Sequence, residues 1–342
     1  MNATLQALVA AALFGASAPL VKWLGVAGTP LVASGILYLA AGVGLLPFRR
    51  RGEAPLRRAD WPLLAGVILV GGVLGPALLI FGLARASATA TSLLLNLETV
   101  FTTILAVALF RESVGWRALA AMALIVAGAA ALTFEQGGAT RSLAGPLAVA
   151  GACACWGLDN NLTQRLSLRD PLAVVRWKGL CAGALSLAIG LAAGERLPAW
   201  RAAALVALVG AAGYGASLVL YVRALRSLGA ARTGTLFATA PFAGALVAIA
   251  LGGDRPSLVL GAAAAAMAGG VALLAFERHE HAHAHEALEH EHQHVHDEHH
   301  QHSHEGLGAG EPGPEPHSHP HKHEPLTHSH PHSPDLHHRH KH

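Results

Sequence analysis

Ten apolar segments follow one another through residues 1–278, and they constrain the fold more than any other feature of the chain. About 20 apolar residues in an α-helix, at a rise of about 1.5 Å each, cross the roughly 30 Å hydrocarbon core of a bilayer. The sequence therefore predicts an all-α integral membrane protein with ten transmembrane helices. These helices are expected at about 5–26, 29–48, 61–83, 87–110, 116–134, 143–165, 172–193, 202–223, 231–251 and 257–276.

The charged residues divide the chain into two unlike parts. Residues 1–278 contain 21 Lys and Arg, 10 Asp and Glu and no histidine, whereas residues 279–342 contain 3 Lys and Arg, 11 Asp and Glu and all 23 histidines. The whole chain is 13% charged, about half the share found in soluble domains. We therefore expect a membrane-embedded body followed by a soluble tail.

Arginines in the short loops predict how the body lies in the membrane. If the N-terminus is cytoplasmic, the loops on that side carry thirteen arginines and the loops on the other side carry five. Short loops rich in Lys and Arg stay in the cytoplasm. The sequence thus predicts a multi-pass protein of the bacterial inner membrane, with both termini in the cytoplasm, the lipid bilayer as a partner and no nucleic-acid partner.

The two halves of the body resemble each other at a shift of 142 residues. Phe14-Gly15 then aligns with Trp156-Gly157, and residues 132–135 align with residues 274–277. Each half contains five predicted spans, an odd number, so the halves must cross the membrane in opposite senses. Inverted repeats of this kind are typical of transporters with a substrate site near the midplane. We predict one repeat over 1–137, a second over 138–278 and a separate tail over 279–342.

Glu98 lies in the middle of a long uncharged stretch. No formal charge occurs between Arg85 and Glu98, and none occurs between Glu98 and Arg111. An ionisable group at that depth costs at least a few kcal/mol, so it must face a partner, a cavity or a pathway. Two interpretations remain open, a protonated packing residue held by hydrogen bonds and a residue that handles substrate or protons.

Other polar residues distinguish the two halves. The triplet Asp159-Asn160-Asn161 aligns with Ser17-Ala18-Pro19, and Glu98 aligns with Ala240. Asp159 and Lys178 are expected at a similar depth, either as a neutralising ion pair or as a pathway acid with a switchable partner. A polar stripe at helical spacing in the eighth span serves either hydrogen bonds between helices or substrate contact. The predicted substrate pathway comprises Glu98, Asn96, Trp156, Asp159, Asn160, Asn161, Lys178, Tyr214, Ser217 and Tyr221.

These patterns resemble the drug/metabolite transporter superfamily, and specifically its EamA-type domains. The resemblance rests on Phe14-Gly15, Trp156-Gly157, Leu97-Glu98-Thr99-Val100, Ala240-Pro241-Phe242, Glu112 and Asp254. It implies a secondary transporter, often an exporter of small metabolites, with a central cavity lined by both halves. The chain departs from the family at Thr99, where the family has proline after the acid. No Walker A motif or nucleophile elbow occurs, so we expect no enzyme activity and no cofactor for transport.

Histidines alternate with other residues over much of the tail. Proline and glycine over 308–320 break any continuous helix, and almost nothing apolar is present to form a core, so the tail is expected to be disordered. Imidazole groups suit divalent Zn, Ni and Co, and metal binding is the interpretation that we favour over a merely solubilising tail. The predicted ligands are His279, His281, His283, His285, His290, His292, His294, His296, His299, His300, His302 and His304.

Three functions are compatible with these features. The first is an exporter of small metabolites or drugs whose tail buffers or senses divalent metal. The second is a divalent-metal exporter of Ni, Co or Zn in which the tail collects ions and Glu98, Asp159 and Asn160 pass them through oxygen sites. The third is a membrane-tethered metal store. For the transporter, the mechanistic hypothesis is that Glu98 exchanges protons during alternating access, since an apolar setting favours a protonated carboxyl group.

Overall fold

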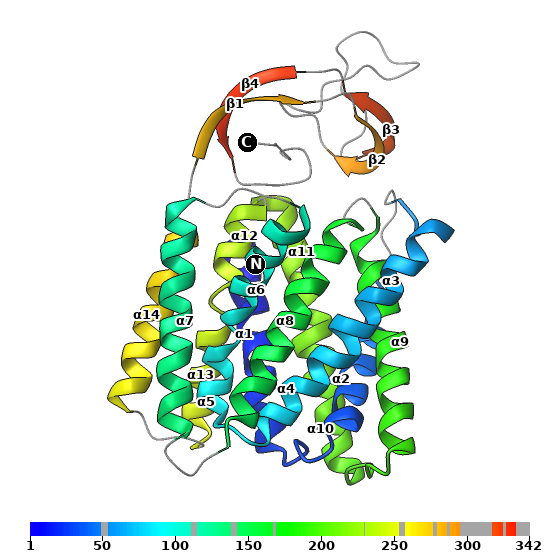
Figure 1. Cartoon of the computed structure of the whole chain (residues 1–342). Coiled ribbons are helices and arrows are strands. Elements are labelled where there is room, and N and C mark those ends of the chain that lie inside the picture. The colour runs from blue at the N-terminus through cyan, green and yellow to red at the C-terminus, as the bar shows by residue number, and fades with distance from the viewer. Residues whose placement is uncertain are drawn as a thin grey trace.

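Helices α1 to α14 stand side by side in one bundle in the computed structural model of the chain (Figure 1). The structure describes residues 1–48, 54–110, 115–137, 142–166, 169–228, 230–252, 257–275, 279–285, 288–294, 317–323 and 326–332. The helices of the first half are α1 (Ala3–Trp23), α2 (Pro30–Gly44), η1 (Arg58–Asp60), α3 (Trp61–Val67), η2 (Ile68–Leu74), α4 (Gly75–Leu83), α5 (Ala88–Leu94), α6 (Leu97–Phe110) and α7 (Trp116–Gly137). Those of the second half are α8 (Ala144–Gln164), α9 (Pro171–Ala192), α10 (Trp200–Gly210), η3 (Ala211–Ala216), α11 (Ser217–Leu228), α12 (Ala230–Phe237), α13 (Ala240–Ala250) and α14 (Leu258–Ala275).

Seven helical stretches among the described residues are long and apolar enough to cross a membrane, which is fewer than the ten predicted. Two of the other predicted spans, at α2 and α14, form shorter apolar helices. The third, α8, is 21 residues long but carries Asp159, Asn160 and Asn161, which lower its hydropathy. The seven stretches are Ala3–Trp23, Arg58–Leu83, Ala88–Leu109, Trp116–Glu135, Pro171–Ala192, Trp200–Ala224 and Thr233–Ala250.

Irregular backbone occurs at matching places in the two halves. The π-helical segment η2 corresponds to η3 at the shift of 142 residues. The break at Leu95-Asn96, between α5 and α6, corresponds to the break at Ala238-Thr239, between α12 and α13, to within one residue. Asn96 forms the first break because its side-chain Nδ2 donates to the carbonyl oxygen of Leu93, 2.9 Å away, in competition with helical bonding. The fourth span is therefore broken although Thr99 stands where the family has proline.

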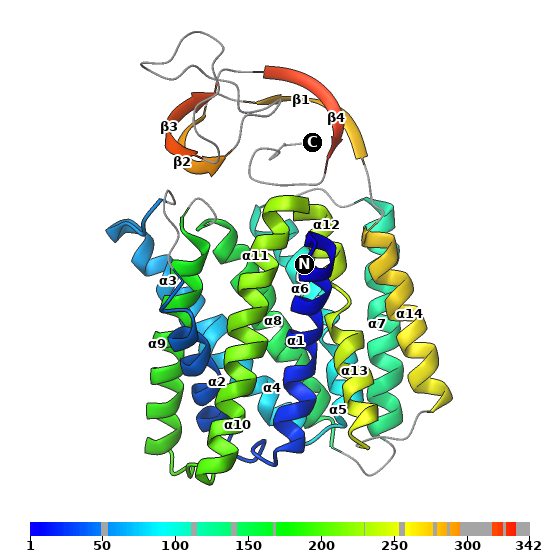
Figure 2. The same ribbon diagram turned by 180° about the vertical axis from the view of Figure 1, so that it is seen from behind.

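The first helix of each half packs closely against the fourth span of the other half. Figure 2 shows α1 between α11 and α13, and α8 packs in the same way against α6. A Cβ placed on Gly15 of α1 would lie 2.0 Å from the carbonyl oxygen of Ala240. A Cβ on Gly157 of α8, the residue that aligns with Gly15, would lie 2.8 Å from the amide nitrogen of Thr102. Glycine is thus required at both crossings, because no side chain fits between the backbones.

The fifth spans, α7 and α14, also contact each other through matching residues. A Cβ on Gly128 would lie 2.9 Å from Cγ of Met267, and a Cβ on Gly270 would lie 2.8 Å from Cγ1 of Ile125. Gly128 aligns with Gly270 and Ile125 aligns with Met267, so the same contact is made twice with the roles of the halves exchanged.

The first helices of the two halves run in opposite directions. Lys22 near the end of α1 donates to the carbonyl oxygen of Ala86, just beyond α4, so α1 and α4 end on the same side of the bundle. The end of α4 in turn contacts the beginning of α8, because a Cβ on Gly82 would lie 2.9 Å from the carbonyl oxygen of Gly145. The beginning of α4 lies beside Trp156, which is further along α8. Helix α8 is therefore antiparallel to both α4 and α1.

The close crossing at Gly15 gives a testable prediction about stability. Replacing Gly15 by alanine is expected to destabilise the protein by about 1–3 kcal/mol, because the added methyl group must push two helices apart. Gly261→Ala in α14 is the matched control, since a Cβ at that helical position meets nothing within 4 Å. Thermal unfolding of the purified protein in detergent measures both. An unchanged melting temperature for Gly15→Ala would show that the two helices can separate at no cost.

The tail contains four strands where the sequence predicted disorder. Strand β1 (His279–His285) pairs antiparallel with β4 (Leu326–His332), and β2 (Leu288–His294) pairs antiparallel with β3 (His317–His323). In antiparallel pairs of this kind the backbone N–H and C=O groups of facing residues bond to each other. The strands lie beyond the end of the bundle at which α1 begins (Figure 1). The rest of the predicted disordered tail lies outside the described residues.

Candidate substrate cavity

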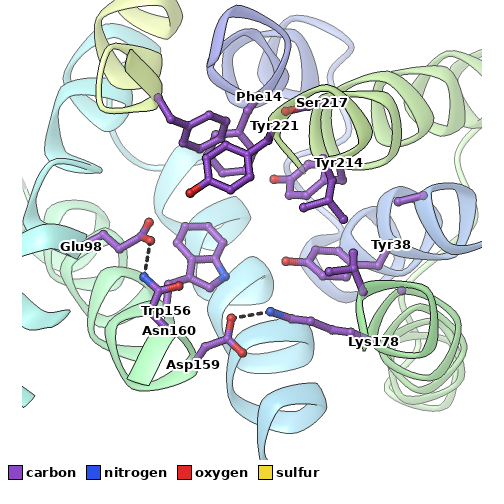
Figure 3. A pocket seen from close by; sticks show the side chains of 16 residues that line it. Phe14, Tyr38, Glu98, Trp156, Asp159, Asn160, Lys178, Tyr214, Ser217 and Tyr221 are labelled. Atoms are coloured by element: carbon purple, nitrogen blue, oxygen red, sulfur yellow. Dashed lines mark hydrogen bonds and ion pairs between the residues drawn. The ribbon is translucent and has the colours of Figure 1, made fainter. Parts of the chain in front are cut away.

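A cavity of about 450 Å³ lies between α1, α2, α6, α8, α9, α11 and α12 (Figure 3). Its lining comes from both predicted halves, and it holds three charged side chains, Glu98, Asp159 and Lys178. It also holds six aromatic side chains, which are Phe14, Tyr38, Trp156, Tyr214, Tyr221 and Phe237. A volume of this size is typical of sites for small organic molecules.

Glu98 enters the cavity from the first turn of α6, immediately after the break in the fourth span. Asn160 of α8 donates from Nδ2 to Oε1 of Glu98 over 2.8 Å, and to Oγ1 of Thr102 over 3.3 Å. The N-terminus of a helix favours a negative charge, as does a hydrogen-bond donor at the carboxylate. The apolar surroundings favour the protonated form instead. Glu98 is therefore set between opposing influences on its charge.

Asp159 and Lys178 form an ion pair on the neighbouring wall. Nζ of Lys178 donates to Oδ2 of Asp159, and the two side chains are 13% and 7% exposed. Oδ1 of Asp159 has no hydrogen-bond partner in the described part of the chain. Gly71 makes room for this carboxylate, since a Cβ there would lie 2.2 Å from Cγ of Asp159. The ion pair is thus present, and a role of Asp159 in the pathway stays a prediction.

The π-helical segment η2 positions two aromatic side chains at the cavity. Within the helix, the carbonyl of Gly71 could accept only from the amide of Gly75 or that of residue 76. The amide of Gly75 donates instead to the carbonyl of Val70, five residues back. Residue 76 is a proline and has no N–H, so the Gly71 carbonyl has no partner in its own helix. The Gly71 carbonyl oxygen instead accepts from Nε1 of Trp156 over 2.9 Å and from the hydroxyl of Tyr38 over 3.2 Å. The irregular winding therefore ties α2 and α8 to the third span.

Five aromatic rings form a continuous series in the lining of the cavity. In order they are Tyr38, Tyr214, Phe14, Phe237 and Tyr221, with neighbouring ring centroids 5.2, 5.4, 5.5 and 5.0 Å apart. Figure 3 shows the hydroxyl groups of Tyr38 and Tyr214 pointing toward the space in front of Trp156. The series thus offers the cavity both polar hydroxyl groups and apolar ring surfaces.

The structure brings together most of the residues predicted for the pathway. Glu98, Trp156, Asp159, Asn160, Lys178, Tyr214, Ser217 and Tyr221 line the cavity. Ser217 also donates to the carbonyl oxygen of Ala10 over 2.8 Å, which links α11 to α1. Asn96 and Asn161 are buried away from the cavity. Asn161 donates to the carbonyl oxygens of Gly157, 2.8 Å away, and Thr102, 3.0 Å away, so it serves packing between α8 and α6.

Three aromatic residues of the cavity were missed, namely Phe14, Tyr38 and Phe237. Tyr38 had a signal in the sequence, because the chain contains only three tyrosines and all of them line this cavity. Phe14 aligns with Trp156 in the other half, so the repeat itself pointed to it. Phe237 carries no such signal, since phenylalanine is common in apolar spans.

The cavity lies in the half of the bundle nearer the start of α1. Its lining comes from the later parts of α2 and α8 and from the early part of α9, which meet on that side. Toward the other end, Tyr214 borders a tightly packed cluster that includes Val21, Leu37 and Leu83. These side chains are buried, so this end of the bundle is closed in the structure.

The described residues contain no group of three or more His, Cys, Asp or Glu side chains that could hold a metal ion. In the cavity, Glu98 accepts from an amide and Asp159 accepts from an ammonium group. Of the tail histidines predicted as ligands, His279, His281, His283 and His285 belong to β1, and His290, His292 and His294 belong to β2. His296, His299, His300, His302 and His304 lie outside the described residues.

Comparison with known proteins agrees with this architecture. The EamA-like transporter family matches residues 1–134 and, a second time, residues 143–276. An uncharacterised transporter from Methanothermobacter thermautotrophicus is 30% identical over 294 residues, which cover 78% of this chain and 84% of that protein. A solved crystal structure has the same fold, with a TM-score of 0.58 and 19% identity over 79% of this chain and 94% of the other.

The family matches together span nearly all of the helical bundle, so the resemblance predicted from the sequence is confirmed. The seven apolar helices agree with a multi-pass protein of the membrane. The chain belongs to the EamA-like transporter family.

Proposed function

We propose that the chain is a secondary-active exporter of small metabolites or drugs, and that its substrate binds in the cavity between the two halves. The observation that carries this proposal is the grouping of Glu98, Asn160 and the Asp159–Lys178 pair in one cavity among otherwise apolar helices. Polar and ionisable groups inside a membrane are costly and mark substrate or ion pathways. The positive-inside count supports an inner-membrane location with both termini in the cytoplasm.

The two halves act, in this proposal, as an inverted repeat over 1–137 and 138–278. Support comes from the double match to one family, from the matching breaks and π-helical segments, and from the opposite directions of α1 and α8. Inverted repeats allow alternating access, in which one end of the cavity closes as the other opens. With the N-terminus in the cytoplasm, the closed end is the outer one.

Glu98 exchanges protons with the substrate or with water during this cycle. Its amide partner Asn160 and the first turn of α6 stabilise the charged form, while the apolar surroundings stabilise the neutral form. A small change of geometry in the cavity is then enough to change which form is preferred.

The histidine-rich tail buffers or senses divalent metal, such as Zn, Ni or Co, as a function separate from transport. The strand register supports this, because histidine stands opposite histidine at His279–His332, His281–His330, His283–His328, His290–His321, His292–His319 and His294–His317. Imidazole is a favourable ligand for these metals when neutral. The alternative, export of divalent metal, has less support because Oε1 of Glu98 and Oδ2 of Asp159 already accept from Asn160 and Lys178.

The cellular nickel content of a metal-sensitive bacterium distinguishes the two functions. We expect cells with the full chain to hold as much nickel as control cells, or more, because the tail retains metal. The 1–278 truncation is expected to lose this retention, and Glu98→Gln is expected to keep it. Membrane expression of all three proteins is the control. If the full chain lowers cellular nickel and Glu98→Gln abolishes that effect, the protein is a metal exporter and the proposed separation is wrong.

A further inference from the structure

We infer that the cavity selects small organic cations that carry an apolar or aromatic body. This inference rests on the proposed function and names the substrate class of the same site. Two features of the cavity lining carry it. The first is the net negative charge of the lining side chains, and the second is the series of aromatic rings from Tyr38 to Tyr221.

The charge of the lining is negative when its acids are ionised. Among the described residues, Lys178 is the one cation in the cavity lining, and its ammonium group is already bonded to Asp159. Glu98 is contacted by the neutral amide of Asn160 rather than by a cation. In addition, Oδ1 of Asp159 is buried without a hydrogen-bond partner in the described part of the chain. The lining thus offers acceptors for a positive group and no free cation for a negative one.

The aromatic rings of the lining are the second feature that favours a cation. The face of an aromatic ring attracts a cation, and cages of such rings bind quaternary ammonium groups. The series from Tyr38 to Tyr221 lines the cavity together with Trp156, and Figure 3 shows Tyr38 and Tyr214 across the cavity from Glu98. A solute whose cationic group lies next to Glu98 therefore also contacts aromatic rings. The apolar body of the solute packs on the same rings.

Other classes of solute fit this lining less well. An anion or a zwitterion would need a cation for its carboxylate, and Lys178 could serve only by leaving the buried carboxylate of Asp159 without its partner. A neutral solute would use the rings but would leave Glu98 without an opposite charge. Divalent metals prefer several oxygen or nitrogen ligands in a small site, whereas this cavity of about 450 Å³ has six aromatic side chains in its lining.

Binding of three matched probes to the purified full-length protein in nanodiscs tests the inference. The probes are trimethylphenylammonium, benzyl alcohol and benzoate, which share a phenyl ring and differ in charge. Isothermal titration calorimetry is expected to give the cation roughly tenfold or more tighter binding than either of the others. Glu98→Gln is expected to remove most of this preference. Tyr214→Leu is expected to weaken cation binding while Tyr214→Phe, which keeps the ring, retains it.

Trp200→Leu is the matched control for removal of an aromatic side chain, since Trp200 is 75% exposed and outside the cavity. Tighter binding of benzoate or benzyl alcohol, sensitive to Tyr214→Leu, would overturn the cation inference and leave the cavity as a transport site. Failure of all three probes to bind would also overturn it. Binding that no cavity variant changes would contradict both this inference and the proposed substrate site.

Discussion

Replacing Glu98 by glutamine is expected to reduce transport in proteoliposomes to the rate of vesicles without protein. Glutamine keeps the size of the side chain and can still bond to Asn160, but it cannot take up or release a proton. Since Glu98 is the acid of the cavity that has no cation beside it among the described residues, its loss removes the proposed proton exchange. The rate is measured for whichever of the three phenyl probes the wild-type protein moves fastest, with and without an imposed pH difference.

Glu135→Gln provides the matched control for this experiment. Glu135 is an exposed acid near the end of α7, away from the cavity, so its substitution should leave both the rate and the pH dependence unchanged. If Glu98→Gln transports at the wild-type rate with the same pH dependence, Glu98 does not exchange protons. A variant that transports at a normal rate but has lost its response to the pH difference would keep Glu98 as the coupling residue and revise its role in substrate binding.

Breaking the Asp159–Lys178 pair from one side is expected to destabilise the protein by about 3–5 kcal/mol, because a buried charge is left without its partner. Lys178→Met leaves the carboxylate unpaired, and Asp159→Asn leaves the ammonium group unpaired. The double substitution removes both charges and is expected to recover much of the lost stability. Thermal unfolding of the four proteins in detergent gives the coupling between the two sites, which is the sum of the two single losses minus the loss in the double variant. Because each single loss is about 3–5 kcal/mol, the coupling is expected to exceed about 3 kcal/mol.

Two results would contradict the prediction that the charges of Asp159 and Lys178 stabilise the protein. If each single variant melts like the wild type, the pair contributes nothing to stability and is free to separate during transport. If the double variant is as unstable as the worse single variant, the side chains act through packing beside Gly71 and Ala182 rather than through their charges.

The positions of the helices follow from hydropathy, while their internal breaks do not. Apolar segments and the match at 142 residues predicted the order of the elements in both halves of the bundle. The predicted ten spans were more regular than the helices observed, because hydropathy does not distinguish α-helical from π-helical winding. The break before Glu98 is accompanied by a side-chain hydrogen bond from Asn96 and by backbone bonds three residues apart, so it occurs without a proline at Thr99.

In the candidate site, too, some residues could be predicted from the sequence and others could not. Charged residues such as Glu98 and Lys178 could be predicted because their cost in an apolar span is large. Aromatic residues such as Phe237 could not, because a ring that lines a cavity and a ring that packs against another helix look alike in sequence. Asn96 and Asn161, which were predicted for the pathway, are buried outside the cavity lining. For Asn161 the reason is that consecutive residues of a helix point in different directions, so it cannot face the same space as Asn160. The strands of the tail come from backbone pairing, which composition alone does not predict.

The carbonyl oxygen of Gly71, which has no hydrogen-bond partner within its own helix, couples the winding of the third span to the side chains of the cavity. Two side chains from different helices, Tyr38 and Trp156, are anchored to this one atom. If the segment tightened to ordinary α-helical winding, the amide of Gly75 would take the place of both donors and release them together. A change of winding by a single residue would then free side chains of α2 and α8 at the same moment.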